Sequence, residues 1–252
     1  MYSSPLCSTS TLFFDAYFCD LTDHKQYMQR CLDLAQLGAG TVAPNPMVGA
    51  VLVHNDIIIG EGYHQQFGLA HAEVNCINNV AGHNKELIAE STLYVSLEPC
   101  SHFGKTPPCT DLIIGKTIPT VVIGCKDSYA EVDGKGIAKL KAAGIKVMTG
   151  ILEKESFDLN KRFFTFHQHH RPYVILKWAQ SSDRKIAGSP GERIFISNEQ
   201  SNRLVHKWRS EEAAILVGTT ASGWSSASMP SSSRASTAPP SSSTLPMAEC
   251  RQ

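Results

Sequence analysis

Residues 91–116, STLYVSLEPCSHFGKTPPCTDLIIGK, predict a strand, a loop and a helix in succession. STLYVSLE at 91–98 is a short apolar run typical of a buried strand. In TPPCTDLIIGK the prolines suit the first turn of a helix, and apolar residues follow them. The stretch therefore predicts a buried strand that leads through a loop into a helix, with Cys100 in the loop and Cys109 at the start of the helix.

The flanking residues continue this alternation of strands and helices. Upstream, the sequence predicts a helix over 23–37, a hairpin over 47–64 around the turn HND, and a short helix over 72–81. Downstream, it predicts a strand over 120–127, a helix over 134–144 and a strand over 145–151. Strands alternating with short helices indicate an α/β sheet covered on both faces. We expect this first domain to close near residue 150.

The residues after this point begin a second, shorter unit. Residues 153–170 predict a connecting helix, and RPYVILKWAQ at 171–180 predicts a strand. A helix over 197–212 and the strand AAILVG at 213–218 follow. The unit then stops after about 50 residues, which is too short to build a typical core alone.

The last part of the chain changes in composition. From residue 221 to residue 252 there is no Val, Ile, Phe or Tyr, and such a segment cannot bury enough apolar surface to order itself. The sequence therefore predicts a disordered N-terminal extension at 1–23, a domain at 24–150, a connecting helix at 151–170, a domain fragment at 171–220 and a disordered tail at 221–252.

Composition limits the class of protein. The 252 residues are 42% hydrophobic and 18% charged, with 23 basic and 23 acidic side chains, and this balance argues against a broad nucleic-acid surface. No apolar run approaches the roughly 20 residues of a membrane span. The first residues lack the basic start of a signal peptide, so we expect a cytoplasmic protein whose eight cysteines are reduced thiols, some of them metal ligands.

Four residues in two segments form a candidate chemical site. His71 and Glu73 stand two apart where an apolar helix begins, and Cys100 and Cys109 each follow a proline. One imidazole and two thiolates provide three ligands for a tetrahedral zinc ion and leave its fourth position to water. Glu73 can accept the proton of that water without binding the metal. The order H-x-E, then P-C and a second cysteine, is that of zinc nucleobase deaminases, although eight residues separate these cysteines instead of two.

Taken singly, these residues also have ordinary explanations. A lone His-x-Glu is common on a solvated helix, and a cysteine after a proline can be a simple loop thiol. We assign three further histidines to a solvated helix end rather than to a second metal site: His167, His169 and His170. The site becomes specific because its four members occur together, in the expected order, on a strand–helix frame.

Residues 24–150 also contain four longer segments that match a known pattern: PNPMVGAV, GEGYHQQFGLAHAEVNCI, LEPCSHFGKTPPCTDLII and DSYAEVDGKG. These segments resemble the deaminase domain of the bifunctional riboflavin biosynthesis deaminase/reductase family. The resemblance implies a cytidine-deaminase-like three-layer α/β/α sandwich with a mixed sheet and one zinc ion per chain. It also implies hydrolytic deamination of a diaminopyrimidinone that carries a ribose phosphate.

The resemblance implies a role for each matching residue. The implied zinc ligands are His71, Cys100 and Cys109, and the implied proton shuttle is Glu73. The implied substrate contacts are Asn45 at the ring, Lys105 near the phosphate, and His64, His102 and Asp127. The loop after Asp127 departs from the family pattern, because D-P-x-P reads DSYA here.

Residues 171–220 resemble the start of the companion reductase domain, which uses NADPH. We expect an incomplete reductase α/β domain, because the sequence departs from the pattern of that family beyond Gly218. A frameshift or truncation would explain the departure, and a native serine-rich linker is the alternative. NADPH is therefore expected only where the reductase half is intact.

Two other functions stay open at this point. One is a different nucleobase deaminase, acting on tRNA adenosine or guanine, which the long cysteine loop and the neutral charge disfavour. The other is a zinc-stabilised binding module without turnover, which would leave Glu73 without a role. We expect a phosphorylated small-molecule pyrimidine and a second copy of the chain as partners, and neither nucleic acid nor membrane.

Overall fold

The computed structural model describes residues 24–104, 107–127, 133–189 and 194–217. The chain divides into one unit that ends at Ala213 and a second that begins at Ala214, of which residues 214–217 are described. The disorder predicted for residues 1–23 and 221–252 falls outside the described residues. Within the described ranges, no helix combines the length and the apolar character needed to cross a membrane.

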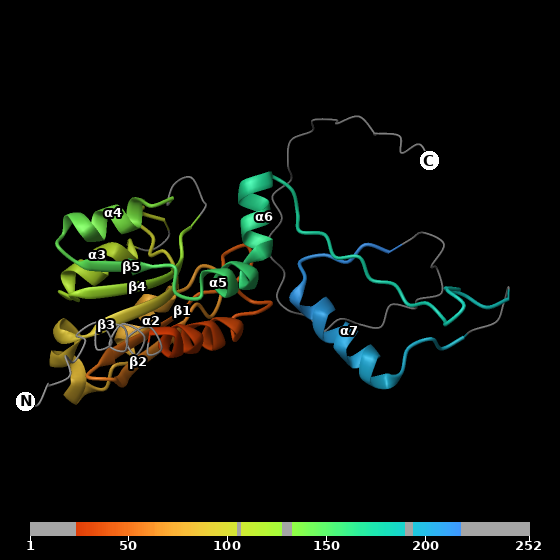
Figure 1. The fold of residues 1–252 in the computed structure, drawn as a ribbon, viewed down its shortest axis with the longest axis horizontal. Helices are drawn as coiled ribbons and strands as arrows, with labels where there is room; N and C mark the ends of the chain where they lie inside the picture. Colours follow the sequence, from red (N-terminus) through yellow and green to blue (C-terminus); the bar gives the residue numbers. More distant parts are fainter. Residues whose placement is uncertain (1–23, 105–106, 128–132, 190–193, 218–252) are drawn as a thin grey trace, which may run out of the picture. The chain divides into compact units, whose positions relative to one another are not determined.

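A five-stranded mixed sheet forms the centre of the first unit (Figure 1). Its strands are β1 (Gly49–His54), β2 (Ile57–Tyr63), β3 (Thr92–Leu97), β4 (Thr120–Cys125) and β5 (Lys146–Thr149), in the spatial order β2-β1-β3-β4-β5. β1 runs antiparallel to β2 and β3, whereas β3, β4 and β5 are parallel to one another. Every strand predicted before residue 151 is therefore confirmed.

The turn HND joins β1 to β2 as the sequence predicted. Asn55 and Asp56 have φ angles of 45° and 62°, in the left-handed region that a two-residue type I′ hairpin turn requires at both central positions. Asparagine and aspartate tolerate this conformation better than other side chains do. The local sequence thus accounts for the hairpin.

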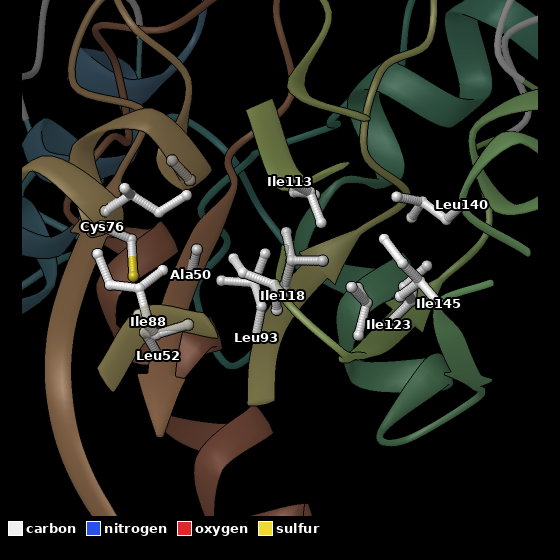
Figure 2. Packing of buried hydrophobic residues seen from close by; sticks show 14 of the residues in the cluster. Ala50, Leu52, Cys76, Ile88, Leu93, Ile113, Ile118, Ile123, Leu140 and Ile145 are labelled. Atoms are coloured by element: carbon white, nitrogen blue, oxygen red, sulfur yellow. The ribbon is translucent and has the colours of Figure 1, made fainter. Parts of the chain in front are cut away.

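Helices cover both faces of the sheet, in the three layers that were expected. On one face, α2 (Ala72–Asn78), α3 (Cys109–Gly115) and α4 (Lys135–Ala142) enclose a cluster that includes Leu52, Leu93 and Ile123 (Figure 2). On the other face, the helix of residues 24–36 packs Met28 and Cys31 against Val51 and Val122. A 3-10 helix, η1 (Gly82–Glu90), was not predicted.

Two glycines allow these helices to approach the sheet closely. A Cβ atom at Gly49 would lie 2.0 Å from the carbonyl oxygen of Cys31, in the helix of residues 24–36. On the opposite face, a Cβ atom at Gly62 would lie 2.2 Å from the backbone nitrogen of Cys76 in α2. Both helices therefore lie against backbone, and a larger side chain at either glycine would push them away.

The connecting helix predicted over 151–170 is two helices. α5 (Glu153–Leu159) and α6 (Lys161–His169) meet at Asn160. The Asn160 side chain accepts a hydrogen bond from the backbone N–H of Met47 at 2.7 Å and donates one to the carbonyl oxygen of Met47 at 2.8 Å. The prediction of one helix was wrong because this tertiary contact holds Asn160 outside helical geometry.

The strands predicted over 171–180 and 213–218 are absent from the described residues of those ranges. A strand needs a partner to satisfy its backbone hydrogen bonds, and Val174 and Leu176 stay exposed without one. The intervening helix is confirmed as α7 (Glu199–Glu211), whose N-cap Asn198 accepts a hydrogen bond from the backbone of Ser201.

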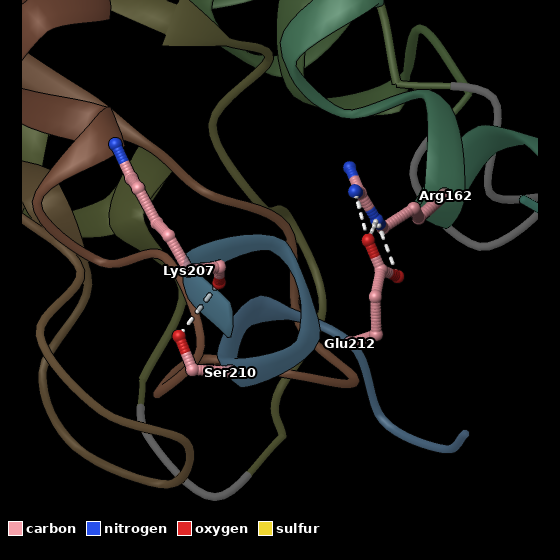
Figure 3. Close-up of polar contacts among 4 residues, drawn as sticks. All are labelled: Arg162, Lys207, Ser210 and Glu212. Carbon is pink, nitrogen blue, oxygen red and sulfur yellow. Dashed lines mark hydrogen bonds and ion pairs between the residues drawn. The ribbon is translucent and has the colours of Figure 1, made fainter. Parts of the chain in front are cut away.

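Two polar contacts mark the C-terminal end of α7 (Figure 3). The guanidinium of Arg162 in α6 donates hydrogen bonds to the carboxylate of Glu212, with a distance of 2.9 Å between Nε and Oε2. The Ser210 hydroxyl donates to the carbonyl oxygen of Lys207 at 2.7 Å. Because none of its side chains is buried, α7 relies on such polar contacts rather than on a core.

Candidate metal centre

Three side chains that lie far apart in the sequence converge at one edge of the sheet. His71 occupies the N-cap position of α2, Cys109 is the first residue of α3, and Cys100 follows β3. Their ligand atoms all lie within 4.8 Å of one another. The structure thus brings together the imidazole and both cysteines of the predicted zinc site.

The distances within this group fit a tetrahedral zinc ion. The Nδ1 atom of His71 lies 3.3 Å from Sγ of Cys109 and 3.5 Å from Sγ of Cys100. Zn–S bonds of about 2.3 Å and Zn–N bonds of about 2.0 Å at the tetrahedral angle place nitrogen and sulfur about 3.5 Å apart. The three residues can therefore hold zinc with little rearrangement.

The two thiols are electrostatically different. The backbone N–H of Cys109 donates to Sγ of Cys100 at 3.3 Å. A hydrogen bond from the Cys109 thiol, reinforced by His71, lowers the pKa of Cys100 well below that of a free thiol. The lowered pKa favours the thiolate form of Cys100, which is the form that binds zinc.

Glu73 lies beside the ligand group in the first turn of α2 and is 3% exposed. Burial raises the pKa of its carboxyl group, and the nearby Cys100 raises it further, while His71 opposes the rise. A carboxyl group whose pKa is shifted toward neutrality can both accept and return a proton. This is the property that a proton shuttle requires.

The ligand group opens into a cavity of about 440 Å³. Four of the five predicted substrate contacts line it: Asn45, His64, His102 and Asp127. The fifth, Lys105, lies outside the described residues. Apolar side chains, among them Phe67, Leu69 and Leu97, supply much of the remaining wall.

His64 and Asn45 form a fixed pair in this cavity. Nδ1 of His64 lies 3.0 Å from the carbonyl oxygen of Ala70, so this nitrogen carries the proton and donates it. Nε2 then accepts a hydrogen bond from the side-chain amide of Asn45 at 3.2 Å. Burial lowers the pKa of His64, which keeps the ring neutral and defines the orientation of the Asn45 amide.

Glu98 is a buried residue that was not among the predicted site residues. Its carboxylate accepts hydrogen bonds from the backbone nitrogens of Asp127 at 3.3 Å, Gly134 at 3.0 Å and Ile137 at 3.1 Å. Because Glu98 stands two residues before Cys100, it ties the metal-binding loop to the segment that carries Asp127. Only its position in the LEPC motif hinted at such a role.

Helix α6 also reaches the cavity, which the sequence did not predict. Phe163, Phe166 and His167 line the same space as Glu73 and His71. His167 lies in the last turn of α6, as predicted, but it is half-buried and lines the cavity, whereas His169 and His170 are exposed. No motif marks this contribution, because it depends on how α6 folds back toward the sheet.

Comparison with known families assigns two ranges of the chain. Residues 21–125 match the family described as "Cytidine and deoxycytidylate deaminase zinc-binding region". Residues 172–241 match the family described as "RibD C-terminal domain". The second match runs beyond residue 220, the predicted end of the domain fragment.

Relatives and solved structures agree with these matches. The chain is 45% identical to the riboflavin biosynthesis protein RibD of Aquifex aeolicus over 77% of this chain and 53% of the relative. It is 42% identical to RibD of Escherichia coli over 77% of this chain and 52% of the relative. The chain spans about half the length of these curated relatives.

A crystal structure from Thermotoga maritima shares the fold with a TM-score of 0.71 and 43% identity. The match covers 75% of this chain and 54% of the Thermotoga chain. That protein is described as a diaminohydroxyphosphoribosylaminopyrimidine deaminase and 5-amino-6-(5-phosphoribosylamino)uracil reductase. Acinetobacter baumannii RibD gives a TM-score of 0.72 at 37% identity, over 77% of this chain and 53% of that one. The likeness confirms the cytidine-deaminase-like fold.

Proposed function

Because this chain is a member of the RibD family that spans about half of its relatives' length, we propose that it is a zinc-dependent deaminase of riboflavin biosynthesis. The proposed substrate is the diaminopyrimidinone with a ribose phosphate after which the Thermotoga relative is named. One observation carries the proposal: the ligand atoms of His71, Cys100 and Cys109 lie within 4.8 Å of one another, beside the buried carboxyl group of Glu73.

The reaction replaces an exocyclic amino group of the ring by oxygen. One water molecule is consumed, the carbon–nitrogen bond breaks, and one molecule of ammonia leaves. Zinc held by His71, Cys100 and Cys109 would supply Lewis acidity toward the water. All other proton movement falls to the side chains of the cavity.

Glu73 is the proposed carrier of the proton. Its carboxylate accepts a proton from the attacking water and delivers it to the ring nitrogen. It then accepts the proton of the hydroxyl group added to the ring carbon and delivers it to the departing amine, as the carbonyl group forms and the carbon–nitrogen bond breaks. Burial raises the pKa of Glu73, which makes the carboxyl group a better proton acceptor than an exposed glutamate. Burial also excludes bulk water that would otherwise compete for the proton.

The predicted substrate contacts are proposed to hold the rest of the molecule. Asn45, oriented by neutral His64, provides amide groups that can hydrogen-bond a pyrimidine edge. Asp127 and His102 line the same cavity, and Glu98 positions the Asp127 backbone. Lys105 would place a cation near the phosphate, which carries close to two negative charges.

The substitution Glu73→Gln tests the proposal. It should retain zinc, because Glu73 is not a ligand, and should slow ammonia release by about a hundredfold to ten-thousandfold. Glu90→Gln is the matched control, because Glu90 is exposed and does not line the cavity. Ammonia release and zinc content are measured with the diaminopyrimidinone ribose phosphate, cytidine and guanine.

The outcomes separate the competing functions. Activity that survives in Glu73→Gln would remove Glu73 from its role, and activity on guanine or cytidine alone would favour another nucleobase deaminase. Zinc binding without turnover of any compound would favour a zinc-stabilised module.

We also propose that this chain by itself lacks the reductase activity. Within residues 171–189 and 194–217 the structure describes one helix, α7, with no buried side chain, and no strand. A dinucleotide-binding domain needs a sheet whose strand ends hold the cofactor. Substrate-dependent oxidation of NADPH, followed at about 340 nm, would contradict this proposal. A cytoplasmic location and a homo-oligomeric state remain part of the proposal.

A further inference from the structure

Helix α6 contributes one wall of the cavity that holds the proposed zinc site. Phe163, Phe166 and His167 lie on this helix and line the cavity together with Glu73. The match to the deaminase family ends at residue 125, and the match to the RibD C-terminal domain begins at residue 172. Helix α6 lies between these two matched ranges. The wall is therefore supplied by a segment to which neither family match assigns a role.

The position of α6 is fixed by contacts at its N-terminal end. Asn160 makes two hydrogen bonds to the backbone of Met47, two residues beyond Asn45 in the PNP segment. Phe164 is 1% exposed, packs with Leu97 and Cys125, and stacks on Phe157 at 4.5 Å between ring centroids. Since Leu97 itself lines the cavity, the helix is anchored to the frame of the site.

The wall combines aromatic surface with one hydrogen-bonding ring. The imidazole of His167 packs against Phe163 with 4.3 Å between ring centroids. Burial lowers the pKa of His167, with a further contribution from His170, so the ring is neutral at pH 7. A neutral imidazole donates one hydrogen bond and accepts another, as contact with a hydroxyl-rich group requires.

The size of the cavity indicates a ligand larger than a single ring. Its volume of about 440 Å³ lies in the range of sites for drug-sized molecules. Asn45 and His64 account for one polar region of the lining, near His71. His167 offers a second polar region, on a different element of the fold.

We propose that α6 is a specificity element of the site, in which His167 hydrogen-bonds the hydroxyl-bearing, phosphorylated arm of the substrate and Phe163 and Phe166 shield that arm from solvent. The inference rests on the proposed function, because that function supplies the arm. It assigns to the connecting helix the discrimination between a ribosylated pyrimidine and a bare one.

The test measures binding of two probes to the zinc-loaded full-length chain. The probes are the diaminopyrimidinone ribose phosphate and the same diaminopyrimidinone without ribose phosphate, titrated by calorimetry into a Glu73→Gln background that prevents turnover. His167→Ala should weaken binding of the ribosylated probe about tenfold, as expected for loss of one hydrogen bond. Binding of the bare pyrimidine should change less than twofold.

Two further variants distinguish a contact from a structural effect. His169→Ala removes an exposed histidine of the same helix and should change neither affinity. His167→Gln retains a donor and an acceptor and should recover part of the lost affinity. In otherwise wild-type protein, His167→Ala should raise KM for the ribosylated compound while kcat changes little.

The possible failures are distinguishable. Equal weakening of both probes by His167→Ala, no weakening, or an equal effect of His169→Ala would overturn the inference and leave the proposed deaminase intact. Failure of the parent chain to bind or deaminate the ribosylated compound would overturn both.

Discussion

Residues 24–170 and residues 171–217 contain similar apolar residues but differ in what those residues do. In the first region, Leu93 and Val122 are fully buried in β3 and β4. In the second region, Leu176 is 78% exposed, in a segment that the sequence marks equally well as a strand. An apolar run thus becomes a strand only where another strand offers it hydrogen bonds and a helix covers it.

The metal centre shows the same principle at a smaller scale. In the first region, glycines in the strands allow helices to pack with their backbone directly against the sheet. Helices α2 and α3 begin at the same edge of that sheet. His71 and Cys109 meet because of this packing. The second region has no comparable frame among its described residues, and its one helix has no buried side chain.

The largest expected effect comes from removing one of the three proposed zinc ligands. Cys109→Ser should abolish zinc binding and lower the unfolding free energy by about 4 kcal/mol. This is the stabilisation expected when the free metal concentration is about a thousandfold above the Kd. Zinc content and denaturation by urea measure both quantities. Cys31→Ser, at a buried thiol outside the ligand group, should keep the metal. Full zinc occupancy in Cys109→Ser would contradict the ligand assignment.

A matched pair of leucines tests the contrast between the two regions directly. Leu93→Ala opens a cavity in the core and should lower the unfolding free energy by about 2–5 kcal/mol. Leu176→Ala makes the same chemical change at an exposed position and should alter it by less than about 0.5 kcal/mol. The two variants are compared by urea denaturation. A large effect at Leu176 would mean that the second region is packed after all.

Asn160 tests whether a single tertiary contact breaks the connecting helix. Asn160→Ala removes both hydrogen bonds to Met47 and should lower the unfolding free energy by about 1–3 kcal/mol. Asn202→Ala, at an exposed position of α7, is the control and should have little effect. Hydrogen exchange should also show faster opening of α6 in the first variant, and unchanged exchange would argue against the contact's importance.

The smallest expected effect concerns an exposed ion pair. Arg30 donates two hydrogen bonds to Glu61 in β2 and lowers the pKa of that carboxyl group. The pKa of Glu61 is lower in the folded protein than its ordinary value of 4.5. The ion pair therefore stabilises the folded state at neutral pH, and this stabilisation is lost as the pH falls from 4.5 through the pKa of the folded state. Glu61→Gln should cost a few tenths of a kcal/mol at pH 7, and less as the solution is acidified through this window.

The second region supplies the control for this ion pair. Glu199→Gln breaks the pair with Arg203 inside α7, and it should not change unfolding of the sheet domain. Urea denaturation over a pH series compares both variants. An effect at Glu199 as large as that at Glu61 would show that α7 unfolds together with the sheet.

Local patterns were sufficient for most of the first region. Short apolar runs predicted β1 to β5, and the turn HND predicted the hairpin that joins β1 to β2. The residue types of the metal centre were also predictable, because zinc chemistry narrows the choice to His and Cys. The break at Asn160 and the absence of strands from residues 171–189 and 194–217 were not predictable, because each depends on the presence or absence of a distant partner.

The sequence by itself determined the order of the strands and α-helices up to residue 150, without the 3-10 helix η1, and the four residue types needed for zinc-assisted proton transfer. Only the tertiary structure decided that these four side chains meet, that Glu98 holds the segment of Asp127, and that α6 closes the cavity with His167. The physical reason is range. Periodicity and residue chemistry are local properties, whereas contacts such as Asn160 to Met47 join residues 113 positions apart and exist only after the sheet has formed.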